Sequence, residues 1–296
     1  MHADEVDVDV DLVRRLIAAE FPHWAALPVQ RVPSAGTDNA IFRLGDELVA
    51  RLPRTPSRTA PLDKEHRWLS RLGPLPLAVP VPLAKGMPAE GYPWEWSVYR
   101  WLEGEEATVE RITDLGGAAI ALAEFVGALQ RVDPTGGPPP GAHNFFRGVP
   151  LARRDAETRD AIAALHGHVD VEAVIAAWEA ALAVAPWSRR PVWIHGDLAA
   201  GNLLVAEGRL VAVIDFGCLG VGDPACDLMV AWTLFPPDER EVFRSALSVD
   251  NETWARGRGW ALSWALIAVP YYLDSNPVIV RDAQRTIADV LADGAR

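Results

Sequence analysis

Three oxygen-bearing side chains lie close together in one short segment of the chain. Asp197 follows a short apolar stretch and a glycine, Asn202 comes five residues later, and Asp215 ends the apolar run of V-I-D-F-G. Two oxygen ligands at one point suit a hard cation such as magnesium, with phosphate oxygens and water completing the octahedron. The remaining carboxylate, that of Asp197, is then free to accept a hydroxyl proton and to orient that oxygen toward a phosphorus. The three residues therefore indicate phosphoryl transfer to a hydroxyl group.

A hairpin is needed to hold these side chains together. Short strands are predicted at 191–194, 202–206 and 210–215, and the turn Glu207-Gly208 joins the last two. Such a hairpin places Asn202 and Asp215 at the same end of a sheet. The chain has no Gly-rich Walker loop with its lysine, so a P-loop nucleotide site is not expected.

The first third of the chain has the pattern of a small sheet with one main helix. Apolar residues at helical spacing predict a helix over 9–20, which a proline ends. Five further short runs alternate or are β-rich, and a second helix follows the third of them. The predicted strands are 28–33, 39–44, 47–52, 82–86 and 95–101, and the predicted helix is 61–72.

From residue 111 the pattern becomes helical, and it is interrupted by the loop D-P-T-G-G-P-P-P-G at 133–141. Helices are predicted near 153–166 and 170–184 and through 224–293, and the apolar stretch from Trp260 to Leu273 is expected to be a buried helix. The predicted fold class is α+β, with a small antiparallel-sheet lobe over 1–102 and a larger, mostly helical lobe over 103–296. The join near residues 102–106 is the expected hinge.

Composition narrows the possible partners. Half of the 296 residues are hydrophobic and 23% are charged, which is an ordinary globular composition. The net charge is −12 and no basic stripe is visible, which argues against a nucleic-acid binder. Residues 1–104 carry 14 acidic and 12 basic side chains, whereas 105–296 carry 26 and 16. The acidic second part either attracts a cationic substrate or keeps the surface soluble.

The expected location is the cytoplasm. Only two cysteines occur, Cys218 and Cys226, which fits a reducing compartment better than a disulfide framework. The acidic N-terminus lacks the apolar segment of a signal peptide, and no apolar stretch has the length of a membrane span. The sequence does not determine the oligomeric state.

The motif H195-G-D-L-A-A-G-N202, followed by I-D215-F-G, resembles the catalytic loop and metal motif of the aminoglycoside phosphotransferase family. This family has the protein-kinase-like fold, in which protein kinases carry H-R-D-x-x-x-x-N and D-F-G. The resemblance extends over nearly the whole chain because the order of lobes also matches. It implies a small-molecule kinase that uses Mg²⁺ and either ATP or GTP.

The resemblance assigns roles residue by residue. Asp197 matches the catalytic base, and Asn202 and Asp215 match the metal ligands. His195 and Asp227 match positions that support the catalytic loop, Asp227 by hydrogen bonds to its backbone. A carboxylate suits that position because it lies at the start of a helix.

The same resemblance identifies a nucleotide site in the first lobe, with departures from the protein-kinase pattern. Arg51 stands where the phosphate-binding lysine is expected, and Glu65 is its predicted partner. Arginine keeps the charge and can grip phosphate or carboxylate through two nitrogens. Ser34 and Thr37 belong to a reduced glycine loop, S-A-G-T-D-N. Arg100 and Leu102 are the hinge residues whose backbone would meet the purine; an inactive pseudokinase is the alternative.

The acceptor is left open by the sequence. An aminoglycoside is the first choice, because the family and the acidic second lobe both favour a polycation. The alternatives are a macrolide, or a metabolic acceptor of the choline, homoserine or sugar-amine type. Candidate acceptor-binding residues are Asp223, Trp264, Tyr271 and Asp274. Asp223 could instead cap the helix that follows it, and Trp264 could instead pack in the core.

Overall fold

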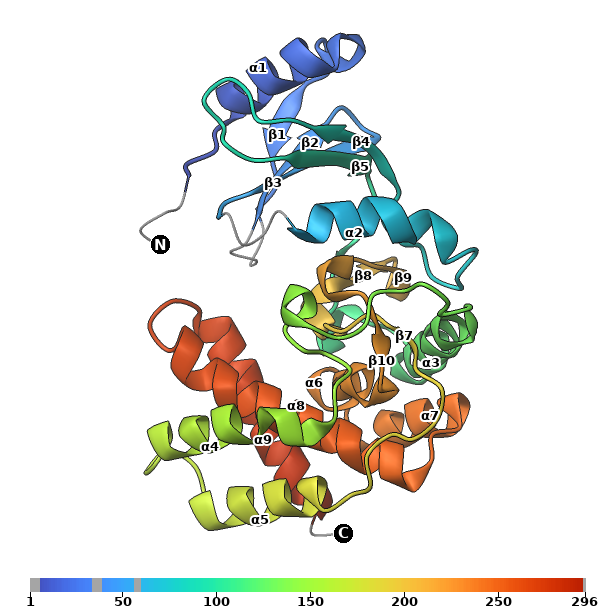
Figure 1. The fold of residues 1–296 in the computed structure, drawn as a ribbon, viewed down its shortest axis with the longest axis vertical. Coiled ribbons are helices and arrows are strands. Elements are labelled where there is room, and N and C mark those ends of the chain that lie inside the picture. Colours follow the sequence, from blue (N-terminus) through green and yellow to red (C-terminus); the bar gives the residue numbers. More distant parts are fainter. Residues whose placement is uncertain (1–5, 34–38, 56–59, 295–296) are drawn as a thin grey trace.

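A five-stranded antiparallel sheet forms the N-terminal part of the molecule (Figure 1). The computed structural model describes residues 6–33, 39–55 and 60–294. The strand order is β1-β2-β3-β5-β4, and burial alternates along β2 and β3 as expected for a sheet with one covered face. The strands are β1 Val29–Arg31, β2 Asn39–Leu44, β3 Leu48–Pro53, β4 Pro82–Gly86 and β5 Trp96–Arg100.

Two helices accompany this sheet. Helix α1 (Val10–Glu20) begins where the Asp9 carboxylate accepts a hydrogen bond from the Leu12 amide at 2.7 Å, and it buries its apolar side in the core that it shares with the strands. Helix α2 (Ala60–Trp68) lies between the sheet and the rest of the molecule (Figure 1). Its position allows it to contribute side chains to both parts.

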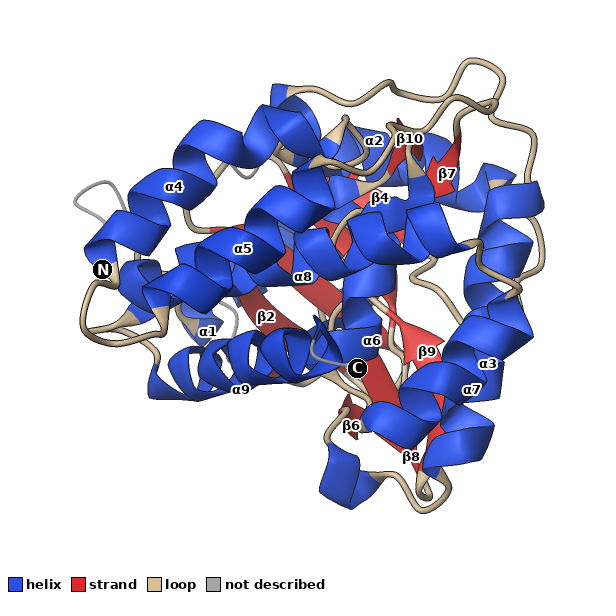
Figure 2. Cartoon of the chain, turned by 90° about the horizontal axis from the view of Figure 1, so that it is seen from below, coloured by secondary structure: helices blue, strands red, loops and turns tan. Residues whose placement is uncertain are grey.

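The remainder of the chain is mostly helical (Figure 2). Helix α8 packs against α9, and α3 packs against α7. The helices are α3 Leu115–Arg131, α4 Asp155–Ala164, α5 Val171–Leu182, α6 Val230–Thr233, α7 Pro237–Leu247, α8 Asn251–Tyr272 and α9 Pro277–Gly294. In the described part of the chain, no helix combines the length and apolar character needed to cross a membrane.

The molecule has two hydrophobic cores among the described residues, and their boundary differs from the predicted division between residues 102 and 103. One core joins α1 to the five-stranded sheet, and the other fills the helical part around side chains such as Trp178 and Trp232. The second core also contains Trp68 and Leu77, which precede the sheet's last two strands. The segment after α2 therefore packs with the helical part, and the division at residues 102 and 103 stays a prediction.

Five short strands flank the polar motif within the helical part. The hairpin predicted from the sequence is confirmed: β8 (Leu203–Ala206) pairs with β9 (Arg209–Val213) across a turn with φ of 50° at Glu207 and 76° at Gly208. The sequence did not predict β6 (Glu105–Glu106), which pairs with β8, or β10 (Gly220–Gly222), which pairs with β7 (Val192–Ile194). Both are too short to show a periodic pattern.

We expect Gly208→Ala to destabilise the fold more than Gly91→Ala. Both glycines have positive φ, which costs about 1–2 kcal/mol for a residue with a side chain. A Cβ at Gly208 would lie 2.0 Å from Thr113 Oγ1, whereas one at Gly91 meets nothing within 4 Å. Overpacking should add a further loss of about 1–3 kcal/mol in urea unfolding. Equal losses for the two variants would contradict the packing of this turn.

Candidate active site

The loop that carries Asp197 is held by a buried carboxylate. Asp227 is fully buried and accepts hydrogen bonds from the backbone amides of His195 at 2.7 Å and Gly196 at 2.8 Å. Gly196 has a φ of 85°, and a Cβ there would lie 2.4 Å from the Cys218 carbonyl oxygen. Burial raises the pKa of Asp227, and these two donors oppose that effect. The contact is the one that the family resemblance implies.

The His195 ring joins this loop to the end of the hairpin. Its Nδ1 accepts a hydrogen bond from the Asp197 amide at 3.2 Å, so its Nε2 carries the proton and donates to the Ile214 carbonyl at 2.9 Å. The ring is completely buried and meets Phe216 edge-on. His195 therefore positions the loop, and its two nitrogens are both engaged.

Asn202 and Asp215 lie at the same end of the hairpin. The Ile214 amide donates to the Asn202 carbonyl at 2.9 Å, which places Asn202 opposite the residue that precedes Asp215. The Asn202 side chain donates from Nδ2 to the Asp197 carbonyl at 2.8 Å and lies 3.5 Å from its carboxylate. The hairpin thus brings all three polar residues of the motif together.

Asp215 has a left-handed backbone that turns its carboxylate out of the strand. Its φ is 60°, and its Oδ1 accepts a weak hydrogen bond from the Gly217 amide at 3.4 Å. The side chain is 43% exposed, in contrast to the buried apolar residues that precede it. A non-glycine residue in this region of backbone space is uncommon and is frequent at functional sites.

The N-terminal sheet contributes Arg51 to the same place. Its Nη1 donates to both Glu65 oxygens, at 3.0 and 3.2 Å, while its Nη2 donates to Asp215 Oδ1 at 2.9 Å. Tyr99 donates its hydroxyl to Glu65 as well, and the Asn39 amide oxygen can accept from Nε of Arg51 at 3.1 Å. The planar guanidinium of Arg51 can donate to Glu65, Asp215 and Asn39 at the same time, which a lysine ammonium does less well.

Charge and burial act against each other at these groups. The partial burial of Asp215 acts to raise its pKa, but the Arg51 charge prevails and the pKa is lowered. Lys64, which also lies on α2, has a pKa lowered by burial, and its Nζ lies 3.1 Å from Nδ1 of His143 and 3.3 Å from its carbonyl oxygen. Lys64 is thereby committed to the loop around His143.

The donor set fits magnesium chemistry. An amide oxygen and a carboxylate oxygen are hard ligands, and magnesium takes its remaining ligands from phosphate and water. Among the described residues, no group of three or more His, Cys, Asp or Glu side chains could hold a metal ion alone. Asn202 and Asp215 therefore suit a metal that arrives with phosphate oxygens.

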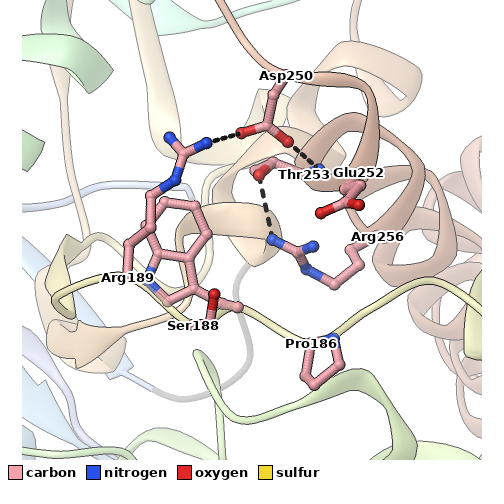
Figure 3. Close-up of a pocket in the computed structure, with 8 residues that line it drawn as sticks. Pro186, Ser188, Arg189, Asp250, Glu252, Thr253 and Arg256 are labelled. Carbon is pink, nitrogen blue, oxygen red and sulfur yellow. Dashed lines mark hydrogen bonds and ion pairs between the residues drawn. The ribbon is translucent and has the colours of Figure 1, made fainter.

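Asp223 occupies a structural position. It is 4% exposed, caps the short helix after it through the Ala225 amide at 3.0 Å, and pairs with Arg256 Nε at 2.9 Å. Arg256 belongs to a small polar pocket where Asp250 caps α8 and Thr253 contacts the guanidinium (Figure 3). This geometry matches the alternative in which Asp223 caps a helix. The Asp223 carboxylate is buried and is already paired with Arg256.

The remaining predicted residues lie in several places. Ser34 and Thr37 lie outside the described residues. Arg100 ends β5, and its amide donates to Val81 at 3.0 Å; Leu102 is half-buried just beyond it. Trp264 packs against the helical core, whereas Tyr271 and Asp274 are exposed near the end of α8.

Sequence reasoning missed Arg147. Its Nη2 lies 3.4 Å from Asp197 Oδ1, and its side chain is 10% exposed. The residue belongs to the loop N-F-F-R-G after the Pro-rich segment, about fifty positions before the motif. Two aromatic residues followed by a cation and a glycine were the only local signal, and nothing in the spacing connects them to Asp197.

The fold and the grouping of these residues define the class. A small antiparallel sheet, a helix that supplies Glu65, and the loop of Asp197 followed by the hairpin that leads to Asp215 constitute a protein-kinase-like architecture. The chain belongs to the phosphotransferase enzyme family, whose sequence profile matches residues 29–260.

Several known proteins are similar to this chain. An aminoglycoside 3'-phosphotransferase from Escherichia coli is 44% identical over 55 residues, which is 19% of this chain and 20% of that protein. One from Salmonella typhimurium is 31% identical over 77 residues, covering 25% of this chain and 28% of that protein. The matched segments thus span less than a third of these relatives' length.

Solved structures share the fold over nearly the whole chain. The GDP complex of aminoglycoside 2'-phosphotransferase-IIIa has a TM-score of 0.74 at 17% identity and covers 97% of this chain and all of that one, 100%. The macrolide 2'-phosphotransferase of Brachybacterium faecium has a TM-score of 0.62 at 23% identity, with coverages of 95% and 97%. The kinase-like α+β fold expected from the sequence is therefore confirmed.

The Arg51–Asp215 ion pair predicts a pH-dependent stability. Because the folded pKa of Asp215 lies below its unfolded value, the pair stabilises the fold at neutral pH, and this contribution is lost as the pH falls below about 4. Asp215→Asn should therefore lower the unfolding free energy at pH 7, and the deficit should shrink toward pH 3 in urea titrations. In an Arg51→Met background the same substitution should show a weaker trend, because His195 and the Gly217 amide still favour the charged carboxylate. A deficit that stays constant with pH would contradict the ion pair.

Proposed function

We propose that this chain transfers the terminal phosphoryl group of a nucleoside triphosphate to a hydroxyl group of a small molecule. The observation that carries the proposal is the grouping of Asp197, Asn202 and Asp215 at one end of the hairpin, with Arg51 paired to Glu65 beside them. Family membership supports it, as do the GDP and ADP complexes of similar structures. We expect the division at residues 102 and 103 to separate the nucleotide-binding part from the catalytic part.

Each residue has a physical role in this reaction. The Asp197 carboxylate would accept the hydroxyl proton and hold the acceptor oxygen in line with the phosphorus, since phosphoryl transfer depends mainly on positioning and charge. Asn202 and Asp215 would hold Mg²⁺, which supplies neutralisation of phosphate charge when bound. Arg51 would contact phosphate oxygens while Glu65 fixes its direction. The intact Arg51–Glu65 pair favours a working site over a pseudokinase.

The phosphate donor is a purine nucleotide in this proposal. Similar structures contain GDP in some cases and ADP or ATP in others, so both ATP and GTP are candidates. The Arg100 amide is already engaged, so the backbone of Leu102 is the proposed hinge contact. Ser34 and Thr37 are the proposed phosphate contacts of the reduced glycine loop. A cytoplasmic location fits this donor and the free, buried Cys218.

An aminoglycoside-type antibiotic is the first proposed acceptor. The curated relatives are aminoglycoside phosphotransferases, and similar structures contain kanamycin or gentamicin. The acidic second part of the sequence would attract such a polycation. Asp274 and Tyr271, both exposed at the end of α8, are the proposed acceptor contacts, together with Trp264 earlier on the same helix.

A macrolide-type acceptor is the second candidate, and a specific observation favours it. Phe145 and Phe146 expose 51% and 37% of their surface on the loop that leads to Arg147, which contacts Asp197. Apolar rings and a cation at this position suit a large, weakly charged molecule better than a polycation. The macrolide 2'-phosphotransferase neighbour supports this alternative at the level of the fold.

We expect Asp197→Ala to abolish phosphate transfer with little loss of stability. The side chain is 37% exposed, so its removal loses little packing, and its contact with the buried Arg147 is long, at 3.4 Å. A screen of aminoglycosides, macrolides, and small amino alcohols such as choline and homoserine, with ATP or GTP and Mg²⁺, measures the transfer. The variant should turn over at least about a hundredfold more slowly than the wild type.

Asp274→Asn, an exposed substitution, provides a control for the transfer step: it should change the Michaelis constant for the acceptor rather than remove turnover. Normal turnover in Asp197→Ala would reject the role of that residue. A wild-type protein that phosphorylates none of the panel and shows no nucleotide-dependent rise in melting temperature would reject the proposed function.

A further inference from the structure

An arginine contacts the proposed catalytic carboxylate. Arg147 Nη2 lies 3.4 Å from Asp197 Oδ1, and nine-tenths of the Arg147 side chain is buried. Nη2 carries two N–H groups, so one can contact Asp197 while the other remains available to a second oxygen. The cation therefore lies where the acceptor hydroxyl and the phosphorus would meet in the proposed function.

The guanidinium has donors that the protein does not use. Nε and Nη1 of Arg147 are buried and have no hydrogen-bond partner within the described ranges. The guanidinium carbon lies 5.5 Å from the ring centroid of the buried Trp260, so a cation–π contact is part of its surroundings. Buried donors are nearly always paired, and an exception of this kind needs an explanation.

A second buried cation makes this arrangement costly. Arg154 approaches the same Trp260 ring at 5.1 Å and donates from Nε to Ser263 at 2.8 Å. Burial and then the charge of Arg147 lower the pKa of Arg154 to about 10. The positive charges of Arg147 and Arg154 repel each other beside the same indole ring, and this repulsion opposes folding. Arg147 is therefore present despite an electrostatic penalty.

The backbone holds Arg147 in place. The buried Asn144 accepts a backbone hydrogen bond from the Arg147 amide at 3.0 Å, and its side chain donates to the Arg147 carbonyl at 3.1 Å. Phe145 and Phe146 both have left-handed backbones, with φ of 52° and 56°. The next carbonyl, that of Gly148, accepts a hydrogen bond from the backbone amide of Asp223 at 2.8 Å. Strained, fixed backbone of this kind is typical of functional sites.

The catalytic loop itself supplies no cation. The sequence between Asp197 and Asn202 is Leu-Ala-Ala-Gly. Arg51 is engaged by Glu65 and Asp215 on the metal side of the site. Of the residues that the structure describes, Arg147 is the cation in contact with the Asp197 carboxylate.

We propose that Arg147 binds the phosphoryl group during its transfer, an inference that rests on the proposed function. In that step a bond forms between the acceptor oxygen and the γ-phosphorus, and the bond from that phosphorus to the β–γ bridging oxygen breaks. The hydroxyl proton passes to the Asp197 carboxylate, and the nucleoside diphosphate leaves with the electron pair. Charge spreads over the equatorial oxygens of the transferring group, where an arginine N–H stabilises it.

Arg147→Met tests this role against Arg153→Met. Arg153 is exposed, lies over the Phe146 ring at 4.8 Å, and is the matched control. We expect Arg147→Met to lower kcat for nucleotide turnover about 10²- to 10³-fold while the nucleotide KM changes less than about threefold. Arg153→Met should leave both constants unchanged. Arg147→Gln, which keeps a polar side chain without the charge, should lose as much kcat if the methionine variant does not fold.

A binding measurement separates a phosphoryl contact from a structural role. Aluminium fluoride with Mg²⁺ and whichever of ADP and GDP the wild type binds mimics the transferring group, so the wild type should bind this mixture more tightly than the diphosphate and Mg²⁺ alone. Arg147→Met should keep its affinity for the diphosphate and lose that gain in titration calorimetry. Retention of the gain, with kcat within about threefold of the wild type, would overturn the inference. A wild type without any Mg²⁺-dependent nucleotide binding would instead contradict the proposed function itself.

Discussion

The geometry of the candidate site depends on the register of the β8–β9 hairpin. Pairing of Leu203 with Val213, extended by the bond from the Ile214 amide to the Asn202 carbonyl, places Asn202 beside Asp215. A slip of one residue would turn the side chains of one strand to the other face and would move Asp215 along the strand relative to Asn202. The positive φ at Gly208 and its contact with Thr113 resist such a slip, so a tight turn fixes a site at the other end of the hairpin.

The other groups of the site are held by interactions that cross between elements. Asp227 fixes the loop of Asp197 through two backbone amides, and Arg51 joins the N-terminal sheet to Asp215 and to Glu65 of α2. Arginine in place of lysine is therefore compatible with the site, because its fork reaches both carboxylates. Helix α2 contributes to both parts of the molecule, which couples the position of the sheet to the end of the hairpin that carries Asp215.

Local signals in the sequence predicted most of the elements and the central motif. The hairpin, helix 9–20 and the strand at 82–86 were recognisable because their periodicity and turn residues are local. Strands β6 and β10 were missed because two or three residues show no period. Arg147 was missed because tertiary packing alone brings its loop to Asp197. The role of Asp223 was left open because a helix cap and a ligand-binding carboxylate look alike in sequence.

Crystals grown with Mn²⁺ and a non-hydrolysable nucleotide analogue test the central claim most directly. Anomalous scattering locates the metal without reference to activity or to the identity of the acceptor. We expect a peak at coordination distance from the side-chain oxygens of both Asn202 and Asp215, with phosphate oxygens as further ligands and the Asp197 carboxylate facing the terminal phosphate. A metal held elsewhere, or bound to only one of the two side chains with Asp197 directed away, would contradict it.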